Sequence, residues 1–185
     1  MHLTQRIEAA GAFLFRYRSQ IPALTLVFFY FLLRQQAGAP DFAGFSLGWS
    51  LLCLGLSLLG FGVRFVTLGY TPEGTSGRNR SRQVADVLNT TGIYSLVRHP
   101  LYLGNFGIFV GISLYPQSGW VLGLGVLLFW LFYVPIIVTE DRFLRGKFGA
   151  AHAAWARETF AVLPNPTHWR PSDRPFVLRT AIRRE

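Results

Sequence analysis

The residues best able to do chemistry stand at the two ends of a long stretch without charge. Arg98 and His99 come directly before the forty uncharged residues 100–139, and Glu140 and Asp141 come directly after them. An arginine, a histidine and two carboxylates can pair with both charges of a zwitterionic small molecule. If the uncharged stretch forms a hairpin, these groups meet at one membrane face. That layout predicts an enzyme at a bilayer surface.

Four apolar stretches have to position these groups. A hydrocarbon core about 30 Å thick needs about 20 helical residues. The expected spans are 21–33, 49–68, 101–115 and 119–138. The first is the weakest, because Arg18 and Arg34 crowd it, and the third is short. The sequence therefore predicts an all-α, polytopic integral membrane bundle of about four transmembrane helices.

Arginines are unevenly distributed among the segments between the spans. They crowd the N-terminal segment, the loop 69–99 and the chain after Thr139, whereas 34–44 holds Arg34 with Asp41 and 116–119 holds no charge. The positive-inside rule places both termini and the loop 69–99 in the cytoplasm. We expect an integral protein of the bacterial inner membrane with a cytosolic cap.

The net charge of +9 does not indicate a nucleic-acid partner, because the basic residues flank apolar spans and no soluble binding module is visible. Arginines beside spans are typical of contact with a lipid bilayer. The single cysteine, Cys53, lies in an apolar run and is expected to be a small core residue. No metal-ligand set is predicted.

Several short strings follow one another in a particular order along the chain. They are Gly92-Ile93-Tyr94, Arg98-His99-Pro100-Leu101-Tyr102-Leu103-Gly104, Glu140-Asp141 with Leu144, Phe148-Gly149, and Leu163-Pro164. Over about residues 45–166 this pattern resembles the isoprenylcysteine carboxyl methyltransferase and phospholipid methyltransferase superfamily. Its members are integral membrane enzymes that use S-adenosylmethionine.

The resemblance implies a set of site residues. Those expected to bind the cofactor are Tyr94, Arg98, His99, Pro100, Leu101, Tyr102, Gly104, Glu140 and Asp141, and those expected to act in catalysis are Arg98, His99, Glu140 and Arg64. Glu140 would pair with the cofactor's ammonium, and Arg98 or a backbone amide with its carboxylate. Tyr94 and Tyr102 would offer flat faces to the adenine or the sulfonium. His99 would accept a proton from an amine only if it had no other partner.

The resemblance also implies an organisation of the chain. We expect one membrane domain over 1–185, with an N-terminal segment and first span in 1–44, a methyltransferase-like core in 45–166 and a basic C-terminal tail in 167–185, of which the last fifteen residues are expected to be poorly ordered. The segment 79–89 is expected to close over the cofactor, with a short helix at 81–88. A C-terminal amphipathic helix is expected on the membrane. Its apolar positions are Leu144, Phe148, Ala151 and Trp155, and it would end at Pro164 and Pro166.

The chain also departs from the superfamily pattern. Asp141 replaces the usual second glutamate, and His152 and Trp155 stand where tyrosines commonly follow Phe-Gly. Ile136 and Ile137 occupy the stretch in which prenylcysteine methyltransferases tend to have an arginine. The missing arginine favours a substrate other than prenylcysteine.

Arg64 lies inside the expected second span, a few residues from its cytoplasmic end. A charge there is costly unless it is paired or reaches the interface. Two interpretations stay open: Arg64 extends to the interface, or it holds an anionic headgroup near the methyl donor.

The leading hypothesis is S-adenosylmethionine-dependent methyl transfer to a membrane lipid or lipophilic small molecule at the cytoplasmic face. One alternative is a membrane reductase of the steroid-reductase type that uses NADPH, although Leu101 and Asn105 stand where those enzymes tend to have an asparagine and an acid. Another is a non-catalytic membrane protein. The sequence leaves open the oligomeric state and whether oxygen, nitrogen or sulfur accepts the methyl group.

Overall fold

The computed structural model describes residues 11, 13–17, 20, 24, 27, 30–31, 46–72 and 83–185. This part of the chain is all-α, and it contains no strand. Its elements, in order, are α3 (Leu47–Tyr70), α4 (Ile93–Leu96), α5 (Pro100–Leu114), α6 (Gly119–Phe148), α7 (Ala150–Glu158), the 3-10 helix η1 (Pro166–His168) and α8 (Leu178–Arg184). The expected first span, 21–33, falls mostly outside the described residues.

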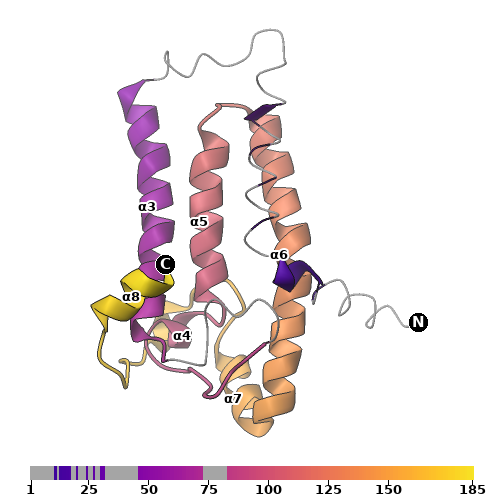
Figure 1. Cartoon of the computed structure of the whole chain (residues 1–185), viewed down its shortest axis with the longest axis vertical. Coiled ribbons are helices and arrows are strands. Elements are labelled where there is room, and N and C mark those ends of the chain that lie inside the picture. The colour runs from indigo at the N-terminus through magenta and orange to yellow at the C-terminus, as the bar shows by residue number, and fades with distance from the viewer. Residues whose placement is uncertain are drawn as a thin grey trace, which may run out of the picture.

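Three long helices run side by side and form the body of the molecule, α3, α5 and α6 (Figure 1). The apolar runs predicted these helices, and the observed starts of α3 and α5 differ from the expected ones by two residues and one. The Ser46 hydroxyl caps α3 by accepting a hydrogen bond from the Trp49 amide, and Pro100 opens α5, where its missing N–H costs nothing.

The apolar side chains of these helices point largely outward. Helices α3 and α6 are each long and apolar enough to cross a membrane, and α5 is a shorter apolar helix. Only 22% of the apolar window of α3 and 33% of that of α6 is buried. A water-soluble protein rarely exposes so much contiguous apolar surface, whereas a lipid environment solvates it. This surface is consistent with a helical membrane protein.

Glycines allow α3 and α5 to pack backbone to backbone. A Cβ added to Gly60 would lie 2.5 Å from the carbonyl oxygen of Gly104 and 2.6 Å from the amide nitrogen of Ile108. A Cβ on Gly111 would collide with Ser57. Small residues at such an interface are typical of helices that associate in membranes.

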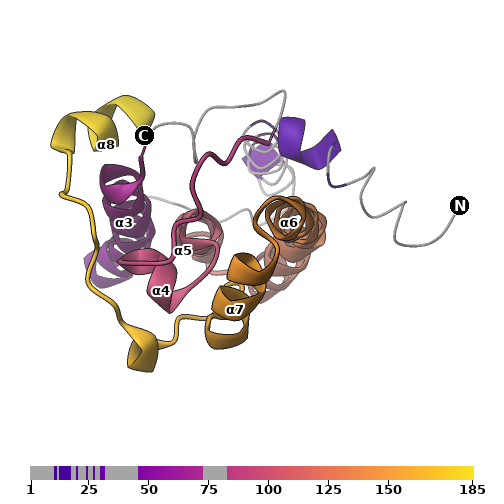
Figure 2. The same ribbon diagram turned by 90° about the horizontal axis from the view of Figure 1, so that it is seen from below.

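The remaining elements gather at one end of the three helices. Figure 2, seen from that end, shows α8 beside α3 and α7 beside α6, with α4 between them. Two backbone bonds join the approach to α5 with the chain after α7: the Arg98 amide donates to Phe160 and the His99 amide to Ala161, at 2.9 and 3.0 Å. Polar segments far apart in sequence therefore meet at a single end of an apolar bundle.

The expectations for the amphipathic helix are wrong in two respects. The helix expected from Leu144 to Trp155 is broken, because α6 runs on to Phe148 and Gly149 then adopts a φ of 53°, a conformation that favours glycine. Consequently Leu144 belongs to α6 and Trp155 to α7. Helix α7 also ends at Glu158, well before the two prolines expected to stop it.

Two further expectations about the loop and the tail are corrected. The described part of the segment 81–88, residues 83–88, contains no helix, and residues 73–82 lie outside the described part of the chain. The tail was expected to be poorly ordered, but Leu178–Arg184 form α8 and pack against α3.

Candidate functional site

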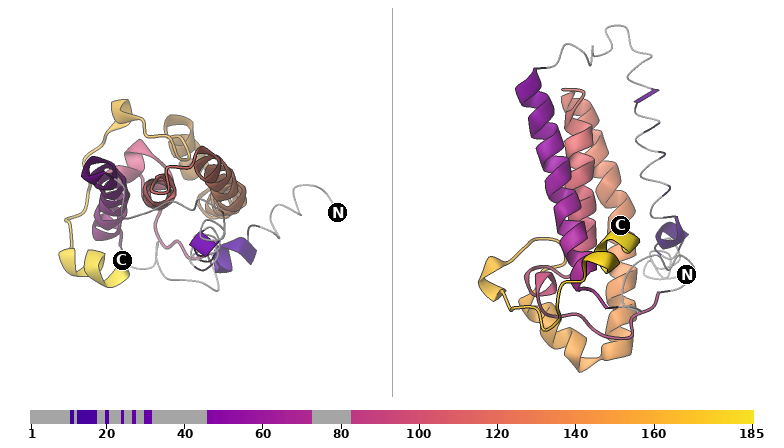
Figure 3. Two further views of the ribbon diagram at one scale, coloured as in Figure 1. Left: turned by 90° about the horizontal axis from the view of Figure 1, so that it is seen from above. Right: turned by 60° about the vertical axis from the view of Figure 1, so that its left-hand side comes forward.

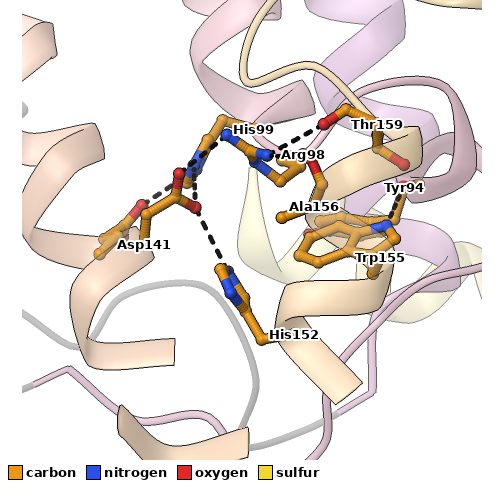
Figure 4. Close-up of polar contacts among 9 residues, drawn as sticks. Tyr94, Arg98, His99, Asp141, His152, Trp155, Ala156 and Thr159 are labelled. Atoms are coloured by element: carbon orange, nitrogen blue, oxygen red, sulfur yellow. Dashed lines mark hydrogen bonds and ion pairs between the residues drawn. The ribbon is translucent and has the colours of Figure 1, made fainter. Parts of the chain in front are cut away.

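The two ends of the uncharged hairpin meet at His99. This residue precedes the first turn of α5, and Glu140 and Asp141 lie on α6 just beyond its charge-free stretch. The Nδ1 atom of His99 is 3.4 Å from Glu140 Oε2, and its Nε2 atom is 3.2 Å from Asp141 Oδ1 (Figure 4). One imidazole therefore bridges both carboxylates, which the hairpin brings together as the sequence predicted.

His99 is buried, and its charge is set by its neighbours. Burial alone disfavours the imidazolium, but the hydrogen bonds and negative charges of Asp141 and Glu140 outweigh it and raise the pKa of His99 from 6.5 to about 9. His99 is consequently protonated at neutral pH. An imidazolium held between two carboxylates cannot accept a further proton, so His99 is poorly suited to act as a general base.

Arg98 is occupied by bonds within the protein. Its Nη1 atom donates to the carbonyl oxygens of Ala156 and Thr159, both at 3.0 Å, and its Nη2 atom donates to Asp141 Oδ2 at 3.0 Å (Figure 4). The two carbonyls belong to the end of α7, where backbone acceptors lack helical partners. Arg98 therefore fastens α7 to α6, and of its donors only the buried Nε lacks a partner among the described residues.

His152 is a buried residue of α7 that sequence reasoning did not include in the site. Its Nε2 atom is 3.5 Å from Asp141 Oδ1, and neither ring nitrogen has a hydrogen-bond partner among the described residues. Burial lowers the pKa of His152, and the positive charges of Arg98 and His99 add to that effect, although Asp141 opposes it. A neutral imidazole beside the carboxylates is thus free to bond with a ligand. One feature of the sequence could have pointed to His152: a histidine stands where the superfamily commonly has a tyrosine.

The two expected aromatic residues lie in different surroundings. Tyr102 is buried, and its ring stacks on His99 at 5.7 Å between centroids and packs on Tyr133 at 5.0 Å. Tyr94 lies on α4; its hydroxyl is 3.5 Å from the Thr71 hydroxyl, and its carbonyl oxygen accepts a hydrogen bond from Trp155. Tyr102 therefore supports the histidine, whereas Tyr94 connects α4 to both α3 and α7.

The remaining residues of the string shape the backbone. Pro100 is buried at the first position of α5, and Leu101 is partly exposed next to it. Gly104 faces α3, where an added Cβ would lie 2.5 Å from Arg64 Cγ. The glycine of the motif thus makes room for the one charged side chain of α3.

Arg64 has partners of its own, away from His99. Its Nε and Nη2 atoms donate to the two carboxylate oxygens of Glu185 at 2.7 and 3.0 Å, and its Nη1 atom donates to Asn105. Asn105 in turn donates to the Tyr133 hydroxyl at 2.9 Å. Among the described residues, Arg64 pairs with none of the groups around His99. No pattern in the sequence indicated the contact between Arg64 and Glu185.

These features define a class: a helical protein with two helices long and apolar enough to cross a membrane and a cluster of charged groups at one end. The chain belongs to the phospholipid methyltransferase family, whose model matches residues 50–151. The matched range contains both α3 and the hairpin of α5 and α6, and therefore both the Arg64 and the His99 clusters.

Three curated relatives are similar to the chain. The cobalt-zinc-cadmium resistance protein CzcN of Cupriavidus metallidurans is 36% identical over 65% of this chain and 53% of its own length. The nickel-cobalt-cadmium resistance protein NccN of Alcaligenes xylosoxydans xylosoxydans is 31% identical over 70% of this chain and 60% of its own. The protein-S-isoprenylcysteine O-methyltransferase of Saccharomyces cerevisiae is 28% identical over 60% of this chain and 47% of its own.

The chain thus spans about half the length of the curated relatives it matches. No solved structure matches it. The family and the yeast relative are both named for methyl transfer.

Proposed function

We propose that the protein transfers a methyl group from S-adenosylmethionine to a membrane lipid or lipophilic small molecule at the cytoplasmic face of the inner membrane. The observation that carries the proposal is the meeting of both halves of the motif around His99, at one end of an apolar bundle. A polar site at the end of a membrane bundle can accept a soluble cofactor from water and a lipophilic acceptor from the bilayer.

The charges around His99 fit the methionyl end of this cofactor. Glu140 has His99 as its ionic partner among the described residues, through Oε2, and its side chain is 24% exposed. A carboxylate that is still accessible suits the cofactor's ammonium. The ring nitrogens of His152, which have no hydrogen-bond partner among the described residues, supply polar atoms for the cofactor's other groups. Because both terminal nitrogens of its guanidinium are occupied, Arg98 is a positioning residue in this proposal.

The proposed chemistry needs alignment more than proton transfer. S-adenosylmethionine, when bound, supplies a methyl group already activated by its sulfonium. The protein's task is to hold the acceptor in line and to exclude water. His99, protonated between two carboxylates, fixes the orientation of Glu140 and Asp141. An acceptor that is already anionic fits such a site better than an amine that must first lose a proton.

The proposed arrangement in the membrane adds further spans to the two long apolar helices α3 and α6. We propose about four spans, including α5 and the segment 21–33, with both termini in the cytoplasm and α4, α7 and η1 as a cytosolic cap that holds the cofactor. The arginine distribution and the meeting of these elements at one end support it.

Titration of purified protein with S-adenosylmethionine and with NADPH, each by isothermal calorimetry, tests the proposal. Glu140→Gln should weaken S-adenosylmethionine binding by roughly ten- to a hundredfold, because a charge-assisted hydrogen bond contributes about 1.5–3 kcal/mol. Glu158→Gln is the matched control, since Glu158 pairs with Arg170 on the exposed surface.

The possible outcomes separate the candidate functions. Binding of NADPH in place of S-adenosylmethionine would identify a reductase, and binding of neither would indicate a non-catalytic protein. Unchanged affinity in Glu140→Gln would remove Glu140 from the cofactor site. Comparative lipid mass spectrometry of cells with and without the protein then identifies the methylated acceptor.

A further inference from the structure

Arg64 presents an oxyanion-binding fork within an apolar helix. Its Nε and Nη2 atoms bind the two oxygens of one carboxylate side by side, which is the geometry in which a guanidinium recognises carboxylate or phosphate. Asn105 holds the remaining nitrogen, and Tyr133 holds Asn105. The fork is therefore oriented by α5 and α6 independently of the carboxylate that it binds.

The carboxylate comes from a segment that wraps back onto α3. We call residues 176–185 the strap; Figure 3, right, shows its helix α8 lying across the lower part of α3. The Phe176 ring sits where a Cβ on Gly69 would be, and the Val177 amide donates to the Gly69 carbonyl at 2.9 Å. Arg184 donates to the carbonyl oxygens of Thr71 and Pro72 at 2.8 and 3.1 Å. The strap thus docks on the end of α3 and delivers Glu185 to Arg64.

The strap contains a short helix that is largely exposed. Helix α8 has seven residues, fewer than an isolated helix needs to be stable in water. Ala181 is buried, but Leu178 and Ile182 are 55% and 63% exposed. Short elements with few buried contacts open locally at low free-energy cost. Release of the strap would leave the fork oriented and its charge without a partner.

We propose that the Arg64 fork is a binding site for the oxyanion head of a lipophilic ligand, and that the strap holds Glu185 in this site until the ligand displaces it. The inference deepens the proposed function and rests on it, because the ligand would be the methyl acceptor. Arg64 projects from an otherwise uncharged helix whose surface is apolar, so a ligand with an apolar tail can reach the fork from the bilayer. A partly buried arginine on an apolar helix needs a counter-charge, and Glu185 supplies it in the ligand's absence.

Direct binding tests the displacement. Octyl phosphate and octanoate carry the two oxyanion types on an apolar tail, while inorganic phosphate and acetate carry them without one. Glu185→Gln should bind the two amphiphiles roughly ten- to a hundredfold more tightly than the wild type, because a competing charge-assisted pair is gone. Arg64→Leu should lose this binding, and Arg64→Lys should keep part of it because the charge remains without the fork. Glu158→Gln should match the wild type.

Proteolysis reports the position of the strap without any methyl transfer. Octyl phosphate should accelerate tryptic cleavage after Arg179 and Arg183, which lie on α8, and should leave cleavage after Arg157 on α7 unchanged. Glu185→Gln should be cleaved rapidly even without the amphiphile.

The results that overturn the inference differ from those that overturn the methyltransferase proposal. Equal or weaker amphiphile binding by Glu185→Gln would make the Arg64–Glu185 pair a purely structural contact, whatever the cofactor titration gives. Tight binding of inorganic phosphate equal to that of octyl phosphate would refute a lipophilic ligand. Absence of S-adenosylmethionine binding, with amphiphile binding as expected, would leave the anion site standing and remove the proposed reaction.

Discussion

Asp141 is the residue on which the charged cluster depends. Its carboxylate is 3.0 Å from Arg98 Nη2, 3.2 Å from His99 Nε2 and 3.5 Å from His152 Nε2. A single acid thus contacts three basic side chains from two segments: Arg98 and His99 directly before α5, and His152 on α7. The family pattern has a longer acid at this position, but aspartate keeps the carboxylate close to the α6 backbone, which suits a group that organises its neighbours.

The raised pKa of His99 predicts a pH dependence of stability. Its charged form contributes stability that is fully present below pH 6.5 and is lost as the pH rises through about 9, because the folded pKa lies above the unfolded one. The melting temperature of the purified protein should therefore fall across this interval. In His99→Gln the fall should be much smaller, since glutamine does not titrate. Parallel curves for the two proteins would contradict this assignment of the charge.

The sequence predicted part of the site for a clear physical reason. A hairpin of apolar helices brings its two ends together, so the proximity of His99 to Glu140 and Asp141 follows from chain order alone. The burial of His152 does not, because it depends on the turn at Gly149 and on where α7 then packs. The partner of Arg64 is 121 residues away in sequence, and no local pattern reports such a contact.

At the scale of elements, the contact between α3 and α5 determines how closely the two polar clusters approach each other. Gly60 and Gly104 face each other across it, and Gly104 also accommodates the side chain of Arg64. Backbone groups lie on both sides, so neither side can yield to an added methyl group as a flexible side chain would. The interface therefore fixes the separation of the helices.

Gly60→Ala should destabilise the protein by about 1–3 kcal/mol, because the added methyl group would overlap the backbone of α5. The matched control is Gly62→Ala on the same helix, where an added Cβ meets nothing within 4 Å. Thermal unfolding in detergent should give a melting temperature several degrees lower for the first variant and an unchanged or slightly higher one for the second. Equal melting temperatures would show that the helices separate freely.

The elements differ in how well the sequence predicted them. Long uncharged runs determine α3, α5 and α6, because an apolar stretch of that length has few alternatives to a helix. The break between α6 and α7 was missed, since helical spacing of apolar residues continues through Gly149. Helix α8 was missed because it is short, and its order derives from the contacts of Phe176 and Arg184 with α3.

At the scale of the whole molecule, the charged clusters lie at one end of the long axis, and the apolar helices extend away from them. The cap elements and the strap lie at one end, and the turn between α5 and α6, residues 115–118, lies at the other (Figure 1). The proposed topology places the first end in the cytoplasm, where the basic residues of α7 and α8 would face anionic lipid heads.

Cysteine labelling of intact cells tests this orientation in a Cys53→Ser background. A membrane-impermeant maleimide should label Ser118→Cys from outside, and it should label Ala150→Cys only after the cells are opened. Both positions are at least partly exposed on the protein, so accessibility differs only through the membrane. Labelling of Ala150→Cys in intact cells at the rate of Ser118→Cys would reverse the assignment.

The bonds between residues 92–99 and residues 156–170 determine when the charged site can form during synthesis of the chain. Gly92, Leu96, Arg98 and His99 all bond to backbone groups between residues 156 and 170. The chain is synthesised from its N-terminus, so residues 92–99 are made before α5 and α6. Their bonding partners, residues 156–170, are made only after α5 and α6. Synthesis of the whole α5–α6 hairpin must therefore precede closure of the charged site. A nascent chain consequently cannot complete the charged site until residues 156–170 have been translated.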